Sequence, residues 1–148
     1  MSKKRDPKNF FTQAEEAEIV AAIRAAENRT SGELRVHLEA HTDEPNREHA
    51  QKIFEEAGMT QTERRNGVLF YLATEDKQFT ILGDKGINEK VPEGFWDDIR
   101  DTLQEHFRQD YFVKGLVAGI EMAGKALAEY FPVQDDDDNE LSDEISKS

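Results

Sequence analysis

The sequence contains no cysteine, no long hydrophobic run and few basic residues, and each shortage excludes a kind of protein. Without cysteine, the chain has neither disulfides nor thiolate ligands for a metal. It has no stretch of 18 or more apolar residues, and no apolar segment of a signal peptide follows the polar, basic N-terminus. We therefore expect a cytoplasmic protein without a transmembrane segment.

Lysine and arginine together number 19 against 32 aspartates and glutamates, which gives a net charge of −13. Residues 1–9 carry +3, residues 134–148 carry −6, and residues 10–133 carry the remaining −10. A surface of this sign argues against nucleic-acid binding, because phosphates must be neutralised by basic groups. It leaves divalent cations as plausible ligands.

The two ends of the chain differ from the part between them. Residues 1–9 are basic and residues 134–148 are acidic, and both segments are almost free of large apolar residues. Such segments cannot bury enough apolar surface to fold, so we predict two disordered tails around one domain at residues 10–133. The run Asp135–Asp138 is expected to be solvated, with weak cation binding as the alternative.

Four amphipathic helices are predicted from apolar spacing and end signals. The first spans about 13–28 and opens with a capping box between Thr12 and Glu15. The second begins after Pro45 and stops at Gly58. The third begins near Pro92, and the fourth runs from about Val113 to a stop at Pro132, with Gly115 and Gly119 placed for close packing.

Three strands are predicted between these helices. Residues 33–40 alternate, with Leu34, Val36 and Leu38 on a buried face and Glu33 and His37 on a solvent face. Residues 68–73 are apolar on both faces and should be central. Residues 78–82 follow a short turn, so this strand must be antiparallel to the central one. A further short strand is expected near 87–91.

The order of elements predicts an α/β fold with three layers, namely an α/β/α sandwich around a small mixed sheet. The connection from the first to the second strand contains a helix, so these strands should be parallel and linked by a right-handed crossover. Helices should cover both faces of the sheet.

This topology predicts that four polar residues meet at one edge of the sheet, although they are distant in sequence. The starts of the first two strands and the end of the third lie at that edge, and they carry Glu33, Asn66, Asp84 and Asn88. Two carboxylates with amide and loop carbonyl oxygens are ligands that Ca²⁺ or Mg²⁺ prefers. The alternative is structural: the glycines serve tight turns, Asp84 caps its own loop, and Glu33 is solvated.

Other sites have weaker support. The opposite edge offers Glu39, His41, Asp43, Thr74 and Asp76, which we interpret as a solvated loop edge. His37 and His41 are ~13 Å apart along an extended strand, too far to share one zinc ion. A GxxG sequence at Gly83–Gly86 follows a strand rather than joining two helices, which argues against the RNA-binding KH motif.

Four segments of the chain, taken in order, resemble those of the TPM domain family. They are Ser31-Gly32-Glu33, Asn66-Gly67-Val68-Leu69, Gly83–Asn88 and Tyr111–Ile120. The resemblance covers about residues 12–131 and implies an α/β/α sandwich. It also implies a divalent-cation site, usually for Ca²⁺, at the acidic edge near the glycine loop. The family includes a thylakoid acid phosphatase and proteins of photosystem II repair.

The chain departs from the family at two positions. Asn66 replaces the usual aspartate before the second strand, and Asn88 replaces the glutamate after the glycine loop, so cation binding should be weak. We expect a monomeric, non-enzymatic module that binds a divalent cation and a protein partner, in stress response or membrane-complex maintenance. The alternative is a weak metal-assisted acid phosphatase in which Glu33 and Asp84 hold the metal and Lys85 or Lys90 contacts phosphate.

Overall fold

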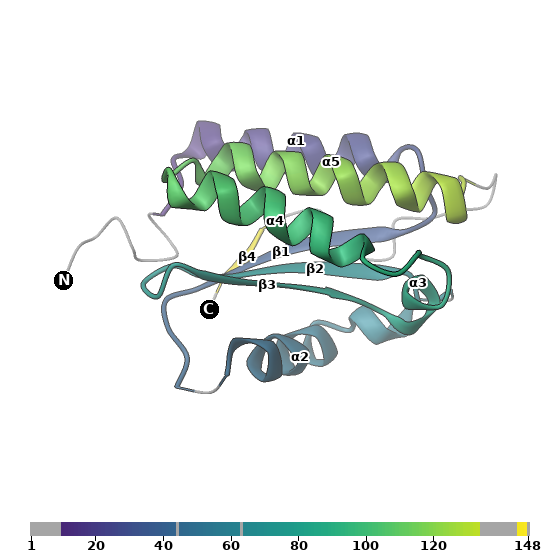
Figure 1. The fold of residues 1–148 in the computed structure, drawn as a ribbon, viewed down its shortest axis with the longest axis horizontal. Helices are drawn as coiled ribbons and strands as arrows, with labels where there is room; N and C mark the ends of the chain where they lie inside the picture. Colours follow the sequence, from purple (N-terminus) through teal and green to yellow (C-terminus); the bar gives the residue numbers. More distant parts are fainter. Residues whose placement is uncertain (1–9, 44, 63, 134–144, 148) are drawn as a thin grey trace.

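The protein has three layers (Figure 1). The computed structural model describes residues 10–43, 45–62, 64–133 and 145–147. Helices α1 (Gln13–Glu27), α4 (Phe95–Arg108) and α5 (Phe112–Tyr130) cover one face of the sheet, and α2 (Asn46–Glu56) covers the other. The predicted α/β/α sandwich is therefore confirmed.

The sheet contains β1 (Glu33–Glu39), β2 (Gly67–Ala73), β3 (Gln78–Gly83) and the short β4 (Ser146–Lys147) in the order β3-β2-β1-β4. β1 and β2 are parallel, and β2 and β3 are antiparallel, as predicted. Every residue of β2 is buried, because it is an inner strand with helices above and below. This arrangement leaves β3 at one outer edge of the sheet.

The first helix begins as its sequence predicts. The Thr12 hydroxyl accepts a hydrogen bond from the Glu15 N–H, and the Glu15 carboxylate accepts one from the Thr12 N–H. This reciprocal pair satisfies two N–H groups that a helix start leaves unpaired. Ile19 and Ile23 then lie fully buried on the face that α1 turns to the core.

The core is divided by the sheet into two parts. The larger part lies between the sheet and α1, α4 and α5, and includes Leu34, Phe70 and Leu103. The smaller lies under α2 and includes Phe54 and Tyr71. Gly115 and Gly119 allow close packing of α5 as predicted, since added Cβ atoms would stand 2.9 Å from His106 Cβ and 3.2 Å from Phe70. Among the described residues, no helix is both long and apolar enough to cross a membrane.

Two sequence predictions about local structure were wrong. The expected strand near 87–91 is replaced by the short helix α3 (Lys85–Asn88), because the Asp84 carboxylate caps its first N–H and Gly86 donates to the Arg65 carbonyl. The polar face of β1 was expected to be exposed, yet Glu33 and His37 are buried, because the layer that contains α2 covers this face.

The strand β4 was not predicted. It lies within the segment 134–148 that was expected to be disordered, and it pairs in parallel with His37 and Leu38 at the outer edge of β1. Ile145 packs against the larger core. The predictions for residues 1–9 and for Asp135–Asp138 lie outside the described residues.

Candidate functional site

Three loops converge at the edge where β1 and β2 begin and β3 ends. The Glu33 N–H donates to the Asn66 carbonyl at 3.3 Å, and the Asp84 N–H donates to the Gly67 carbonyl at 2.9 Å. The Gly86 N–H donates to the Arg65 carbonyl, also at 2.9 Å. The mixed topology thus places Glu33, Asn66 and Asp84 together at one end of the sheet.

Glu33 and Asp84 belong to one row across the sheet. Glu33 pairs with Gly67 on β2, and Gly67 is the hydrogen-bonded partner of Asp84. Residues in one cross-strand row project to the same face, here the α2 face. Both acids are buried, with 2% and 6% of their surface exposed.

The backbone of Met59, in the short 3₁₀ helix η2 (Met59–Gln61), covers the middle of this row. Its carbonyl oxygen lies 3.2 Å from the point where a Cβ of Gly67 would stand. A side chain larger than hydrogen at this position would push η2 away. The Met59 carbonyl oxygen therefore faces Gly67 on β2, the strand that lies between Glu33 and Asp84.

The Asp84 carboxylate is held by the guanidinium of Arg65. Arg65 Nε lies 2.6 Å from Asp84 Oδ2 and Arg65 Nη2 lies 2.8 Å from Oδ1, the two-pronged geometry of a strong charge-assisted pair. The hydrogen bond to Asp84 raises the pKa of Arg65 above its ordinary value. Arg65 adopts a left-handed φ of 52°, and this turn brings its side chain to Asp84.

Asn88 lies on the other face of the sheet. Its Nδ2 donates to the Gly83 carbonyl at 2.9 Å, and its Oδ1 accepts from Trp96 Nε1 at 2.9 Å. A Cβ on Gly83 would stand 2.3 Å from the Trp96 ring, so the indole lies directly over this glycine. The structure therefore does not bring Asn88 to the two acids, and its amide joins β3 to α4.

Asn66 has an unusual environment. Its side-chain oxygen Oδ1 is buried, and no described residue hydrogen-bonds to it. Its N–H is satisfied by the Thr62 hydroxyl at 3.2 Å. A buried amide oxygen without a partner costs about 1–3 kcal/mol, and a bound water or cation would offset that cost.

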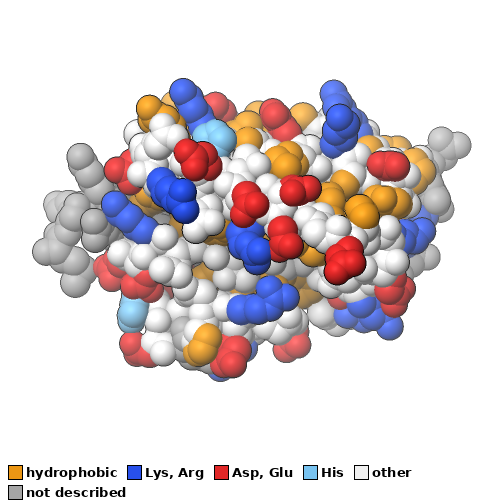
Figure 2. Space-filling view, viewed as in Figure 1, with side chains coloured by type: hydrophobic (Ala, Val, Ile, Leu, Met, Phe, Trp, Pro, Cys, Tyr) orange, Lys and Arg blue, Asp and Glu red, His pale blue; other side chains and the backbone are white. Residues whose placement is uncertain are grey.

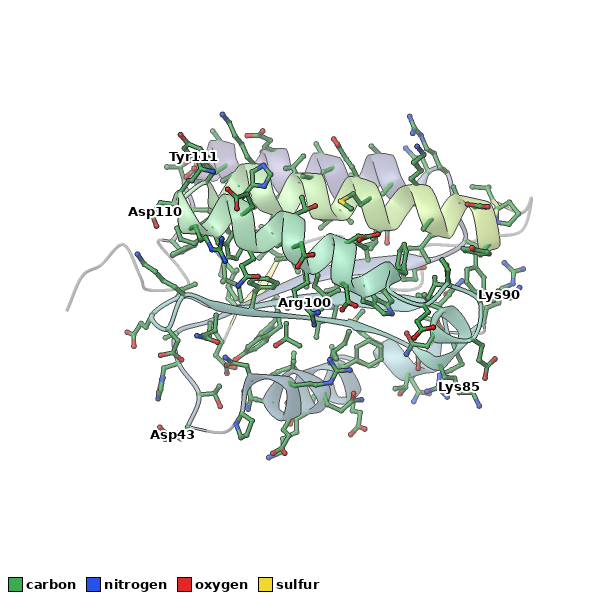
Figure 3. All side chains as sticks on the ribbon, viewed as in Figure 1. Asp43, Lys85, Lys90, Arg100, Asp110 and Tyr111 are labelled. Atoms are coloured by element: carbon green, nitrogen blue, oxygen red, sulfur yellow. The ribbon has the colours of Figure 1, made fainter. Side chains whose placement is uncertain are left out.

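These residues fit a hard cation only in part. Glu33, Asp84 and the Met59 carbonyl supply the oxygen chemistry that Ca²⁺ prefers, whereas the Asn88 oxygen is already used by Trp96. Within the described ranges, no group of three or more acids and histidines is arranged to hold a metal. Lys85 and Lys90, the candidate phosphate contacts, point outward at this corner of the molecule (Figure 3).

A polar cluster under α2 was missed by the sequence analysis. Glu39 Oε2 lies 2.6 Å from His49 Nε2 and accepts a hydrogen bond of 2.8 Å from the Tyr71 hydroxyl. His37 stacks on Tyr71 with ring centroids 6.0 Å apart. Burial lowers the pKa of His37 below its ordinary value, and the nearby Glu39 opposes this shift. The alternation of β1 places His37 and Glu39 on one face, but only the packing of α2 adds His49.

His41 joins two loops at the opposite edge of the sheet. Its Nδ1 lies 2.8 Å from Asp76 Oδ1, and its Nε2 lies 2.9 Å from Asp43 Oδ1. These hydrogen bonds, first to Asp76 and then to Asp43, raise the pKa of His41 above 6.5. The prediction of a solvated loop edge holds only in part. His41 and Asp43 are exposed, but Asp76 and Glu39 are half-buried and Thr74 is fully buried.

The similarities of this chain to known proteins agree with the fold. A family model for the TPM domain matches residues 4–126. The solution structure of BA42 from the psychrophilic bacterium Bizionia argentinensis is 51% identical with a TM-score of 0.89, covering 94% of this chain and 96% of that protein. Among curated proteins, nothing matches.

Two more distant solution structures share the fold alone. The N-terminal domain of cg2496 from Corynebacterium glutamicum is 18% identical with a TM-score of 0.64, covering 81% of this chain and 76% of that one. An N-terminal domain from P. gingivalis is 22% identical with a TM-score of 0.69, covering 85% and 82%. By the match over most of its length, this chain belongs to the TPM domain family.

Proposed function

We propose that this chain is a non-enzymatic binding module whose sheet edge holds a divalent cation weakly, Ca²⁺ in preference to Mg²⁺. The observation that carries the proposal is the buried row of Glu33, Gly67 and Asp84, which has an acid on each side of a glycine. Ca²⁺ accepts irregular sets of carboxylate and carbonyl oxygens, whereas Mg²⁺ demands a stricter octahedron. Two further oxygens are available beside this row. The Met59 carbonyl faces Gly67, and Asn66, whose buried amide oxygen has no hydrogen-bond partner among the described residues, directly precedes Gly67 in the chain.

Arg65 explains why binding should be weak. Its guanidinium already neutralises Asp84, so a cation that uses this carboxylate must displace an internal positive charge. In the cation-free protein, Arg65 supplies the positive charge that the buried Asp84 carboxylate needs, since only 5% of the Asp84 side chain is exposed. Arg65 therefore acts as a competitor of the cation, and its removal should strengthen binding.

The test is a Ca²⁺ titration followed by backbone amide shifts in wild type, Arg65→Gln, Asp84→Asn and the control Asp43→Asn. We expect saturable shifts at Glu33, Gly67 and Asp84 in the wild type and tighter binding in Arg65→Gln. Asp84→Asn should remove the shifts, and Asp43→Asn, on the opposite edge, should leave them unchanged. Shifts absent from this edge at millimolar Ca²⁺ in both wild type and Arg65→Gln would refute the cation site.

Thermal stability gives a second measurement of the same competition. Arg65→Gln leaves the buried Asp84 charge unpaired, which costs several kcal/mol when a partner of a buried pair is removed, here reduced because 38% of the Arg65 side chain is exposed. A ligand that binds only the folded state raises its stability. Ca²⁺ should therefore raise the melting temperature of Arg65→Gln more than that of the wild type.

The alternative of a weak metal-assisted acid phosphatase is supported by the matching family model, which carries the name TPM phosphatase. The site favours it less, because Asp84 is paired with Arg65 and the body of the chain repels phosphate anions. We expect no turnover of phosphomonoesters with Ca²⁺, Mg²⁺ or Mn²⁺. Turnover that Asp84→Asn abolishes would establish the phosphatase instead.

We further propose that the module binds a protein partner, and that it acts in stress response or in the maintenance of a membrane complex. This proposal is supported by analogy with the family.

A further inference from the structure

The outer edge of β3 is an unprotected strand. β3 lies at the end of the sheet order, and it crosses the front of the molecule between α4 and α2 (Figure 1). Its six residues, QFTILG, include no charge and no proline. Proteins usually protect an exposed edge with charges, proline or a bulge, because unpaired backbone groups attract another strand.

The backbone groups at this edge can be assigned from the ladder with β2. Asp84 bonds to Gly67, and bonding residues alternate along an antiparallel pair. The N–H and C=O groups of Phe79 and Ile81 therefore point away from β2. No described residue outside the sheet shares a hydrogen bond with these four groups. At the end of the strand, the outward carbonyl of Gly83 is occupied by Asn88.

Two hollows lie along this edge, one toward each end of β3. The first, of about 480 Å³, is next to Ile81 and Gly83 and is lined also by Trp96, Arg47 and Arg100. The second, of about 450 Å³, is next to Gln78 and Phe79 and is lined also by Lys77, Arg100 and Arg108. Arg100 belongs to both hollows and lies between α4 and β3 (Figure 3).

The charges around the edge come from both helical layers. Arg47 extends from α2 and Arg100 from α4, so that one arginine lies on each side of the strand. Glu93 and Asp97 line the first hollow, but no acid lines the second. The first hollow therefore has as many acids as arginines, and only the second has a basic lining. Over this face as a whole, acids and bases are interspersed (Figure 2).

We propose that the outer edge of β3 binds an extended segment of a partner protein with two adjacent acidic residues, as an added strand. Backbone hydrogen bonds to Phe79 and Ile81 would give affinity. Successive side chains of a strand point to opposite faces, so one acid faces Arg100 and the next faces Arg47. Arg100 is paired with Asp97 on its own helix, but both side chains are more than half exposed. Such a surface pair is weak, so an added acid can replace Asp97 at little cost. The other edge of the sheet already accepts a short strand, β4, in this manner.

The proposal rests on the proposed function only in its claim that the module binds a protein, and its test is therefore run without divalent cations. The probe is the synthetic peptide Thr-Val-Asp-Glu-Val-Thr, compared with Thr-Val-Lys-Lys-Val-Thr, in EDTA, with backbone amide shifts as the readout. We expect saturable shifts at Phe79 and Ile81 with the acidic peptide and at least tenfold weaker binding of the basic one. Absence of shifts in β3, or equal binding of both peptides, overturns the proposal.

Three variants locate the contact. The double variant Arg47→Gln/Arg100→Gln should weaken acidic-peptide binding at least tenfold, whereas the matched double variant Lys114→Gln/Lys125→Gln, on α5, should not. Ile81→Pro removes an outward N–H without removing a bond to β2, so it should abolish binding while the circular dichroism spectrum keeps its folded form. Equal weakening by both double variants would show that net charge, not this edge, attracts the peptide.

The same experiments distinguish the proposed cation site from the proposed peptide-binding edge, and they test whether a second copy of this chain occupies β3 instead. Peptide binding that fails while Ca²⁺ still shifts the Asp84 loop refutes the docking edge and leaves the cation site standing. A second copy of this chain on β3 would appear as dimers in sedimentation equilibrium without peptide, and it would overturn the acidic segment as occupant.

Discussion

At the residue scale, the pairing of His41 with two aspartates predicts a raised pKa of the imidazole that can be measured. The hydrogen bonds to Asp76 and Asp43 favour the protonated imidazole and raise its pKa above 6.5. The contribution to stability is fully present below pH ~6.5, the ordinary value of an unfolded histidine, and is lost as the pH rises through the raised folded pKa. NMR titration of the His41 ring should show this raised value.

Two single substitutions test which of the two aspartates raises the His41 pKa more. Asp76→Asn should lower the His41 pKa more than Asp43→Asn does, because the Asp76 hydrogen bond is the larger cause. The same NMR titration of the two variants measures this. Equal effects, or a His41 pKa at the unfolded value in the wild type, would contradict the pairing seen here.

Arg65 shows where residue-level prediction from the sequence ends. The topology was sufficient to place Glu33 and Asp84 at one edge, because the directions of three strands fix which loops meet. The pairing of Arg65 with Asp84 depends on a left-handed backbone conformation at Arg65. The sequence does not indicate this conformation, because position 65 is neither glycine nor asparagine. The structural alternative for Asp84, capping its own loop, is confirmed by its bond to the Lys85 N–H.

At the element scale, α3 depends on the absence of a side chain at Gly86. A Cβ there would stand 2.2 Å from the Arg64 carbonyl oxygen and 2.6 Å from the Arg65 carbonyl oxygen. These are backbone atoms, so they move only with their loop. Gly86→Ala should therefore cost about 1–3 kcal/mol of unfolding free energy or more, measured by chemical denaturation.

Gly58→Ala is the comparison for this variant. Gly58 has a φ of +75° but open surroundings, so alanine there should cost about 1–2 kcal/mol through backbone strain alone. Gly86→Ala should also disturb the Arg65–Asp84 pair and change the response to Ca²⁺, which Gly58→Ala should leave intact. A Gly86→Ala protein with wild-type stability and Ca²⁺ response would show that the loop adapts freely.

The long elements were predictable because periodicity, caps and breakers agree in each. The first helix was predicted over 13–28 and found over Gln13–Glu27, with the capping box at its start. Short elements lack such redundancy. Ile87 and Val91 suggested a strand, yet the single cap from Asp84 determined a helical turn, and β4 consists of two polar residues whose pairing has no periodic pattern.

At the scale of the whole molecule, the C-terminal strand connects the end of the chain to the polar cluster under α2. Ser146 Oγ lies 2.7 Å from His37 Nδ1, and Lys147 pairs with Glu16 on α1 at 2.5 Å. His37 has a lowered pKa mainly through burial. Stability that depends on neutral His37 is present above pH ~6.5 and is lost as the pH falls through the folded pKa.

A chain that ends at residue 144 tests this connection. We expect the His37 pKa to rise toward its ordinary value, because removal of β4 exposes the ring, and the loss of stability between neutral pH and pH ~5 to become smaller. Lys147→Ala is the control: it removes a pair with Glu16 worth under about 1 kcal/mol but keeps Ser146 on His37. An unchanged His37 pKa in the shortened chain would show that α2, and not β4, buries this ring.

The position of Trp96 has a practical consequence for the whole molecule. It is the single tryptophan of the chain, and its indole lies over Gly83 and donates to Asn88, between the end of β3 and α4. The fluorescence of the protein therefore reports on one corner, the corner where the cation row, the short helix α3 and the open strand edge meet. The chain thus carries its own optical probe beside both proposed binding sites.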